Sequence, residues 1–243
     1  MNKCLSLFCV FFLSCAESDY SDLLLNKLKI NKSDYDEYLI NRSNGIHRLG
    51  GINEKDSTWG IITAHGYYPM GWSTKGFEWV SPIVELSHRQ IPVWFFKYDW
   101  NDCPEYSADY LYRETEKLIE NNSHLDSLWI IGHSLGGVVT SLFAEKWDRD
   151  FPITIHSIAA PLAGMGRRGP DCENISREEY KISSTVSYTQ WKTVQAQDGA
   201  FKNLKFDPQE VFIDGGTSIL LPGMWNNSRL GHNRSIQWVC ENI

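Results

Sequence analysis

The sequence predicts one α/β domain built on a mostly parallel central sheet, with helices on both faces of the sheet. Short apolar runs suited to buried strands alternate along the chain with segments whose apolar residues recur at helical spacing, and this alternation is typical of parallel sheets. The 243 residues are enough for one sizeable core, and the 42% of hydrophobic residues is typical of a globular chain.

The first sixteen residues predict export. Lys3 supplies a positive charge, an apolar run follows over residues 5–13, and small residues close the segment. This order is that of a secretory signal peptide at 1–16, and the apolar run is too short to span a bilayer stably. Residues 12–15 also resemble a bacterial lipobox, in which Cys15 would be lipidated, although Phe12 stands where leucine is usual. Cleavage after Ala16 stays open, so we expect a secreted or periplasmic protein, or an outer-membrane lipoprotein tethered through Cys15.

The elements of the domain can be placed from the run of apolar residues. Residues 17–45 are polar and rich in Asp and Asn, which predicts a leader before a domain at 46–243. A polar, glycine-bearing insertion at 163–183 is a candidate short lid. In chain order we expect a strand at 59–64, a strand at 92–96, a helix at about 106–121, a strand at 128–131, a helix at 138–147, a strand at 152–160, two last strands at 191–196 and 210–213, and a helix at about 233–242.

Three cysteines fall in the expected domain, namely Cys103, Cys172 and Cys240. In an oxidising compartment two of them could form a disulfide. Cys103 and Cys172 both lie in polar, turn-rich stretches, so we favour that pair. The cysteine spacing has no CxxC pattern, so we expect no metal site.

The charge balance argues against a polyanionic partner. The net charge is −7 at pH 7 and the pI is near 5.5, whereas contacts to phosphates need clustered Lys and Arg. The sequence has no basic run and no RNA-binding signature, and we therefore expect no nucleic-acid partner.

The strongest motif is Gly132-His133-Ser134-Leu135-Gly136-Gly137, a G-x-S-x-G pattern. It directly follows the apolar run at 128–131 and directly precedes the helical run at 138–147, which is the context that the motif requires. A serine on such a sharp turn has a strained backbone, and glycines on both sides let neighbouring backbone pass close by. The N-terminus of the following helix adds a positive field where negative charge develops. We therefore expect Ser134 to be a nucleophile.

At this motif the chain resembles the α/β-hydrolase superfamily, in particular its bacterial lipase- and esterase-like members. Three further segments match in order, so the resemblance covers most of the chain after about residue 55: an HG turn at 64–67, a strand end and turn at 159–164, and Leu230-Gly231-His232. In this family the HG turn and the residue after the nucleophile donate backbone N–H groups to an oxyanion hole. The resemblance assigns these two donors to Tyr67 and Leu135.

The family order of nucleophile, acid and histidine implies His232 as the base that Ser134 needs. His156 also follows Ser134 but lies in an expected buried strand, where a core role is favoured. Two acids could orient the imidazole. Asp198 and Asp214 each follow an apolar run and precede a glycine. Relatives usually carry the acid after the penultimate strand, which favours Asp198 over Asp214.

Aromatic residues near these segments would, by analogy with the fold, lie at the mouth of the site. Tyr68 and Trp72 follow the HG turn, and Trp225 precedes His232. We expect these three side chains to line an apolar pocket for an acyl group.

The resemblance implies hydrolysis of a carboxylic ester, either a lipid or another acyl ester, through an acyl-enzyme on Ser134, with no metal and no organic cofactor. Thioesterases, acyltransferases and amidases use the same residues, so the substrate stays open. An exported binding protein that keeps the fold without catalysis is the alternative from another class. Because Ser134, Asp198 and His232 occur in the expected order, the sequence favours the hydrolase.

Overall fold

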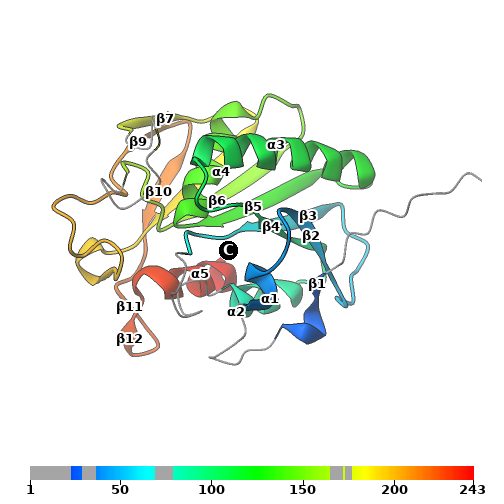
Figure 1. Cartoon of the computed structure of the whole chain (residues 1–243), viewed down its shortest axis with the longest axis horizontal. Helices are drawn as coiled ribbons and strands as arrows, with labels where there is room; N and C mark the ends of the chain where they lie inside the picture. Colours follow the sequence, from blue (N-terminus) through cyan, green and yellow to red (C-terminus); the bar gives the residue numbers. More distant parts are fainter. Residues whose placement is uncertain (1–22, 29–36, 69–78, 165–171, 173–176) are drawn as a thin grey trace, which may run out of the picture.

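The computed structural model describes residues 23–28, 37–68, 79–164, 172 and 177–243. Its centre is an eight-stranded sheet with strand order β1-β2-β4-β3-β5-β6-β8-β10 (Figure 1). Strands β2 and β4 pair antiparallel, and all other neighbours in this sheet are parallel. The strands are β1 (Leu23–Leu24), β2 (Gly45–Gly50), β3 (Trp59–Ala64), β4 (Val93–Lys97), β5 (Ser127–His133), β6 (Ile153–Ile158), β8 (Val186–Lys192) and β10 (Thr217–Leu220).

Helices cover both faces of this sheet. Helices α3 (Pro104–Asn121) and α4 (Leu135–Lys146) pack on one face, while α2 (Val80–Ser87) and α5 (Gly231–Asn242) pack on the other, where α1 (Glu37–Ile40) also lies (Figure 1). Successive strand residues point to opposite faces. Ile62 and Ile130 accordingly join the core under α3 and α4, whereas Ile61 and Ile131 join the core under α2 and α5. The predicted parallel sheet with helices on both faces is confirmed.

The apolar runs predicted the central strands correctly. The expected strands at 59–64, 92–96, 128–131 and 152–160 are β3, β4, β5 and β6, with ends shifted by a few residues. Each is buried on both faces, which is why β3, β4 and β5 are mostly apolar, although β6 has the mixed sequence ITIHSI. The expected helices at 106–121, 138–147 and 233–242 are α3, α4 and α5.

The last two strands of the sheet were predicted wrongly. They are β8 and β10, not 191–196 and 210–213. The apolar residues Phe212 and Ile213 belong to β9 (Phe212–Asp214), which pairs with β7 (Glu179–Lys181) in a separate two-stranded sheet. Strand β10 is exposed along its whole length, so it carries no buried apolar run to reveal it. A short hairpin of β11 (Met224–Trp225) and β12 (Ser228–Arg229) follows it.

Part of the expected leader at 17–45 packs into the domain. Strand β1 pairs with β2, which begins at Gly45, and the side chains of Leu23 and Leu39 are fully buried. The folded core therefore includes residues before position 46. The export segment at 1–16, with Cys15, lies outside the described residues.

Cys103 and Cys172 form a disulfide with a Cα–Cα distance of 5.6 Å, as predicted, and Cys240 is a free, buried thiol. The disulfide fastens the insertion at 163–183 to the loop that precedes α3. Most of that insertion lies outside the described residues, and its described end contains β7. Within the described ranges, no helix has both the length and the apolar character that crossing a bilayer would require.

Candidate active site

Ser134 lies on the turn between β5 and α4, with backbone angles φ 54° and ψ −119°. This is a strained conformation for a residue with a side chain, and such strain is typical of functional turns. The turn is possible because of its glycines. A Cβ on Gly132 would lie 2.4 Å from the carbonyl oxygen of Gly136, and a Cβ on Gly136 would lie 2.4 Å from two backbone oxygens at the end of β3. The predicted strand-turn-helix context of Ser134 is thus present.

The HG turn lies directly against Ser134. A Cβ on Gly66 would be 3.1 Å from the Ser134 Cβ, so only glycine lets the turn approach this closely without a shift. His65 shapes the turn: its Nδ1–H donates to the Gly66 carbonyl at 2.8 Å, and its ring stacks on Tyr98 at 4.2 Å. Burial, and then the nearby Lys97, lower the pKa of His65 to about 3, so the ring is neutral. His65 therefore has a structural role in the turn.

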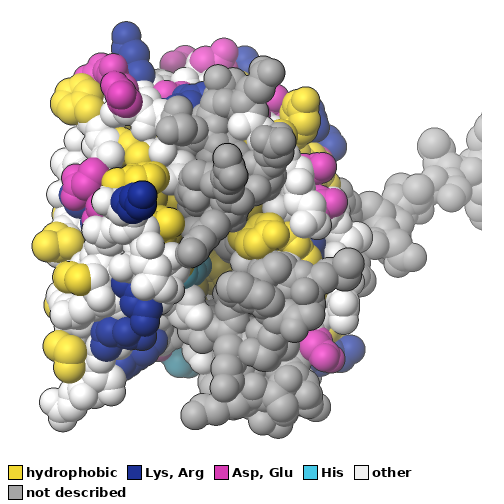
Figure 2. Space-filling view, turned by 60° about the vertical axis from the view of Figure 1, so that its left-hand side comes forward, with side chains coloured by type: hydrophobic (Ala, Val, Ile, Leu, Met, Phe, Trp, Pro, Cys, Tyr) yellow, Lys and Arg dark blue, Asp and Glu magenta, His cyan; other side chains and the backbone are white. Residues whose placement is uncertain are grey.

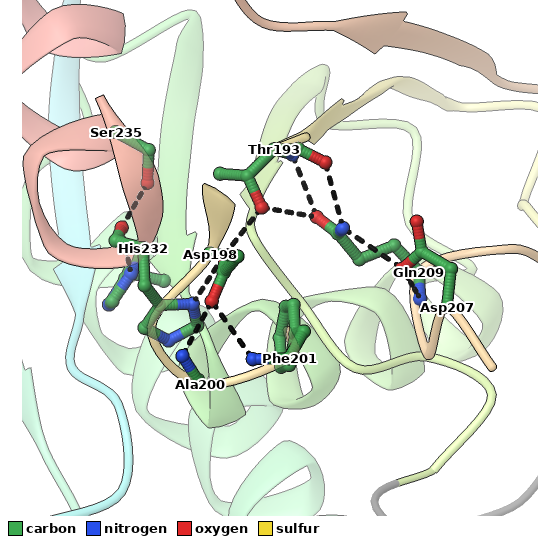
Figure 3. Close-up of polar contacts among 9 residues, drawn as sticks. Thr193, Asp198, Ala200, Phe201, Asp207, Gln209, His232 and Ser235 are labelled. Carbon is green, nitrogen blue, oxygen red and sulfur yellow. Dashed lines mark hydrogen bonds and ion pairs between the residues drawn. The ribbon is translucent and has the colours of Figure 1, made fainter. Parts of the chain in front are cut away.

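Asp198 and His232 form a hydrogen-bonded pair. The Nδ1 atom of His232 lies 3.0 Å from Oδ2 of Asp198, whose side chain is fully buried (Figure 3). A carboxylate only accepts hydrogen bonds, so Nδ1 carries the hydrogen and Nε2 is left with a free lone pair in the neutral ring. This is the tautomer that a general base requires. Asp214 lies in β9, where its backbone pairs with β7, and no described contact joins it to His232.

Four donors surround the Asp198 carboxylate. Oδ2 also accepts the Thr193 hydroxyl at 2.5 Å, and Oδ1 accepts the backbone N–H groups of Ala200 and Phe201 at 2.8 and 3.2 Å (Figure 3). Burial opposes ionisation of this carboxyl, but the hydrogen bonds from His232, Thr193 and Ala200 outweigh it and hold the pKa of Asp198 below its usual value. Asp198 is therefore ionised at neutral pH.

His133 connects the serine turn to the His232 turn. Its Nε2–H donates to the backbone carbonyl of His232 at 3.1 Å, and the two rings lie 4.7 Å apart between centroids. Burial, followed by the proximity of His232, lowers the pKa of His133 well below its usual value, so this ring is neutral. The residue before Ser134 thus holds the backbone that carries His232. Sequence reasoning assigned His133 only to the motif and did not find this contact.

Comparison with known proteins gives one curated relative and many similar folds. No family model matches the chain. The proline iminopeptidase of Saccharolobus solfataricus is 29% identical over 126 residues, which are 46% of this chain and 39% of that protein. The match thus covers about two fifths of the relative's length.

Among solved structures, a candidate thioesterase from Silicibacter sp. TM1040 matches with a TM-score of 0.51 and 13% identity, over 82% of this chain and 77% of that one. The α/β serine hydrolase without a lid from Xanthomonas campestris matches with a TM-score of 0.46 and 16% identity, over 80% and 84% of the two chains. Mouse α/β hydrolase domain-containing protein 10 matches with a TM-score of 0.49 and 14% identity, over 82% of this chain and 93% of that one. The chain has the α/β-hydrolase fold. The fold that the resemblance at the serine motif implies is confirmed.

Two residues that support Asp198 were not found from the sequence. Thr193 follows β8, is buried, and makes three contacts with the Gln209 side chain. Gln209 Oε1 accepts the Thr193 N–H at 2.8 Å and lies 3.2 Å from the Thr193 hydroxyl. Gln209 Nε2 donates to the Thr193 carbonyl at 3.0 Å. The Gln209 amide is in turn bonded to Asp207 at 3.0 Å (Figure 3). Thr193 had been placed inside an expected strand, and a contact across 16 residues leaves no local pattern.

The aromatic residues expected at the mouth of the site differ in their surroundings. Tyr68 is buried and packs edge-on against Trp100, with centroids 5.8 Å apart. Trp225 is partly buried beneath the Arg234 guanidinium, 4.8 Å from the ring centroid. Trp72 lies outside the described residues. Tyr67, an expected backbone donor, directly follows Gly66 and has a 39% exposed side chain.

Proposed function

We propose that this α/β hydrolase is a serine hydrolase that cleaves carboxylic esters through an acyl-enzyme on Ser134. The observation that carries the proposal is the hydrogen bond between His232 and the buried Asp198, which His133 holds beside the strained serine turn. A serine hydroxyl becomes a useful nucleophile only when an oriented base can take its proton. No metal or organic cofactor is needed for this chemistry.

In the proposed reaction Ser134 Oγ attacks the ester carbonyl while His232 Nε2 takes the hydroxyl proton. Asp198 stabilises the imidazolium that forms. The backbone N–H groups of Tyr67 and Leu135 donate to the oxyanion of the tetrahedral intermediate, and the N-terminus of α4 adds a favourable field. His232 then gives the proton to the leaving alcohol. Water, activated by His232, attacks the acyl-serine and releases the acid, which restores Ser134.

Thioesters and amides are the alternative substrates, because two similar proteins are named for reactions on them. One similar structure is a candidate thioesterase and one relative a proline iminopeptidase, and both reactions could use the same nucleophile, base and acid. We favour esters because the motif and the HG turn resemble those of lipases and esterases, with Tyr68, Trp72 and Trp225 as proposed contacts of the acyl group.

The test is hydrolysis of p-nitrophenyl esters from acetate to palmitate, with Ser134→Ala and the control Ser127→Ala at the opposite end of β5. We expect turnover by the parent and the control, and a fall in kcat of at least about 10⁴-fold in Ser134→Ala. Fluorophosphonate labelling of Ser134 without ester turnover would favour a thioester or amide substrate. A folded protein that shows neither labelling nor turnover would refute the hydrolase and favour a binding protein.

We also propose that the protein is exported, with lipidation at Cys15 as the tether. The Cys103–Cys172 disulfide supports export, because such bonds persist in oxidising compartments. Mass spectrometry of the mature N-terminus after expression in a bacterium tests this. An acylated Cys15 supports the tether, a start at Glu17 indicates plain secretion, and an intact Met1 refutes both.

A further inference from the structure

Exposed apolar side chains gather on the last strand of the sheet and the hairpin that follows it. Ile219, Leu220 and Met224 are 42%, 62% and 57% exposed. Leu220 ends β10, which pairs with β8 on one side and, in the described part of the chain, with no strand on the other. Ile219 and Leu220 are successive residues of β10, so their side chains flank its free edge from opposite faces. Exposed apolar side chains grouped along such an edge mark surfaces that contact a partner or a membrane. We call Ile219, Leu220, Met224 and Arg229 the hairpin surface.

The hairpin surface is basic, although the protein as a whole is acidic. The chain has a net charge of −7, yet no Asp or Glu occurs from Gly215 to Cys240. Arg229 is exposed and lies opposite Met224 across the hairpin, so the cation and an apolar side chain are direct neighbours. Arg234 lies over the Trp225 ring and donates to the carbonyls of Arg229 and Trp225. Within the described ranges, neither arginine has a carboxylate partner.

The β11–β12 hairpin projects from the molecule beyond α5 (Figure 1), which suits contact with a flat surface. Its turn residues Asn226 and Asn227 have φ 49° and 56°, the left-handed values of a tight hairpin turn. In Figure 2, basic and apolar side chains lie close together on the lower left of the molecule, and the acidic side chains of this side lie higher up.

We propose that the hairpin surface docks the protein on a membrane that contains anionic lipid. Arginine side chains are attracted by anionic headgroups, and apolar side chains beside them enter the boundary between headgroups and acyl chains. Tryptophan, here Trp225, is typical of that boundary. A second copy fits less well, because a two-fold contact would bring Arg229 of one molecule onto the hairpin surface of the other, whose four residues include no acid.

Docking here would bring the His232 end of the molecule to the lipid, since α5 follows the hairpin directly and begins at Gly231. The proposal does not depend on the proposed hydrolysis, because binding to vesicles can be measured without turnover.

The test is co-sedimentation with vesicles of phosphatidylcholine mixed with phosphatidylglycerol, and with vesicles of phosphatidylcholine alone. The full chain carries Cys15→Ala throughout, so that no acyl anchor contributes. We expect preferential binding to the anionic vesicles, and weaker binding at high ionic strength because salt screens the charges. Leu220→Ser and Met224→Ser should each lower the partition coefficient about 10-fold, and Arg229→Gln about 5-fold.

The matched control is Phe212→Ser. Phe212 is 64% exposed but lies in β9 of the separate two-stranded sheet, opposite the acidic Glu179, so its loss should leave binding unchanged. Circular dichroism confirms that each variant is folded. An equal loss of vesicle binding in Phe212→Ser and Leu220→Ser would overturn the proposal. Failure of the parent protein to bind anionic vesicles would also overturn it. A parent that instead forms a dimer, and loses it in Leu220→Ser, would show that a second copy covers this surface.

Discussion

Valine in place of Thr193 would test the polar network behind His232. The Thr193 hydroxyl donates to Asp198 Oδ2 at 2.5 Å, and both side chains are buried. Valine keeps the shape of threonine and leaves the backbone N–H of residue 193 bonded to Gln209. The substitution therefore removes a single donor from an ionised carboxylate. Hydrogen bonds to charged groups contribute about 1.5–3 kcal/mol, so we expect the free energy of unfolding at neutral pH to fall by about that amount.

The loss of unfolding free energy in Thr193→Val should depend on pH. The pKa of Asp198 is held below its usual value in the folded protein, in part by Thr193. An acid of this kind stabilises the fold above its unfolded pKa, which is about 4. That stability is lost as the pH falls through the folded pKa. Valine raises the folded pKa of Asp198, so the difference between parent and variant should be full at neutral pH and should shrink below about pH 4.

The assay is urea unfolding followed by circular dichroism across the acidic range, with Thr63→Val as the matched control. Thr63 lies in β3 and is as buried as Thr193, but its hydroxyl donates to the neutral carbonyl of Trp94 at 3.1 Å. We expect this variant to lose about 0.5–1.5 kcal/mol at every pH. A loss in Thr193→Val that stays constant with pH, as in the control, would show that the hydroxyl does not stabilise the Asp198 carboxylate.

Two further predictions concern the acid and the serine turn. Asp198→Asn should lower kcat on a p-nitrophenyl ester about 10⁴-fold, because an amide no longer stabilises the charged His232. Asp214→Asn should leave kcat unchanged. Equal losses of kcat in the two variants would contradict the assignment of Asp198 as the acid. Gly136→Ala should lower the free energy of unfolding by about 3 kcal/mol, since its Cβ would meet backbone oxygens at 2.4 Å, while Gly199→Ala, with nothing within 4 Å, should change it little. Urea titration checks both glycine variants, and a tolerated alanine at 136 would mean that the turn can relax.

The sequence predicted best where local pattern and burial coincide. The central strands are apolar because both faces are covered, and the serine turn carries its glycines within six residues, so both could be found without the structure. Strands at or next to the edges of the sheet were missed for the opposite reason. Strand β2, Gly45–Gly50, has the sequence GIHRLG, and β10 is exposed throughout, so neither carries a run of buried apolar residues.

The choice of acid shows the same limit at the site. Asp198 and Asp214 each follow an apolar stretch and precede a glycine, and the sequence separates them only by family order. In the structure the hydrogen bond to His232 separates them, across 34 residues of chain. Thr193 and Gln209 were not found because a buried polar contact between loops leaves no periodicity in the sequence.

The place of α5 in the chain sets the time at which the site can exist during synthesis. Helix α5 carries His232 and packs against α2, and Arg89, just after α2, donates to the carbonyls of Cys240 and Ile243. His133 and His232 are 99 residues apart, which at about 5–20 residues per second is about 5–20 s of translation. During that interval the serine turn can form without its imidazole. A nascent chain, or one cut before α5, would therefore carry Ser134 without its proposed base.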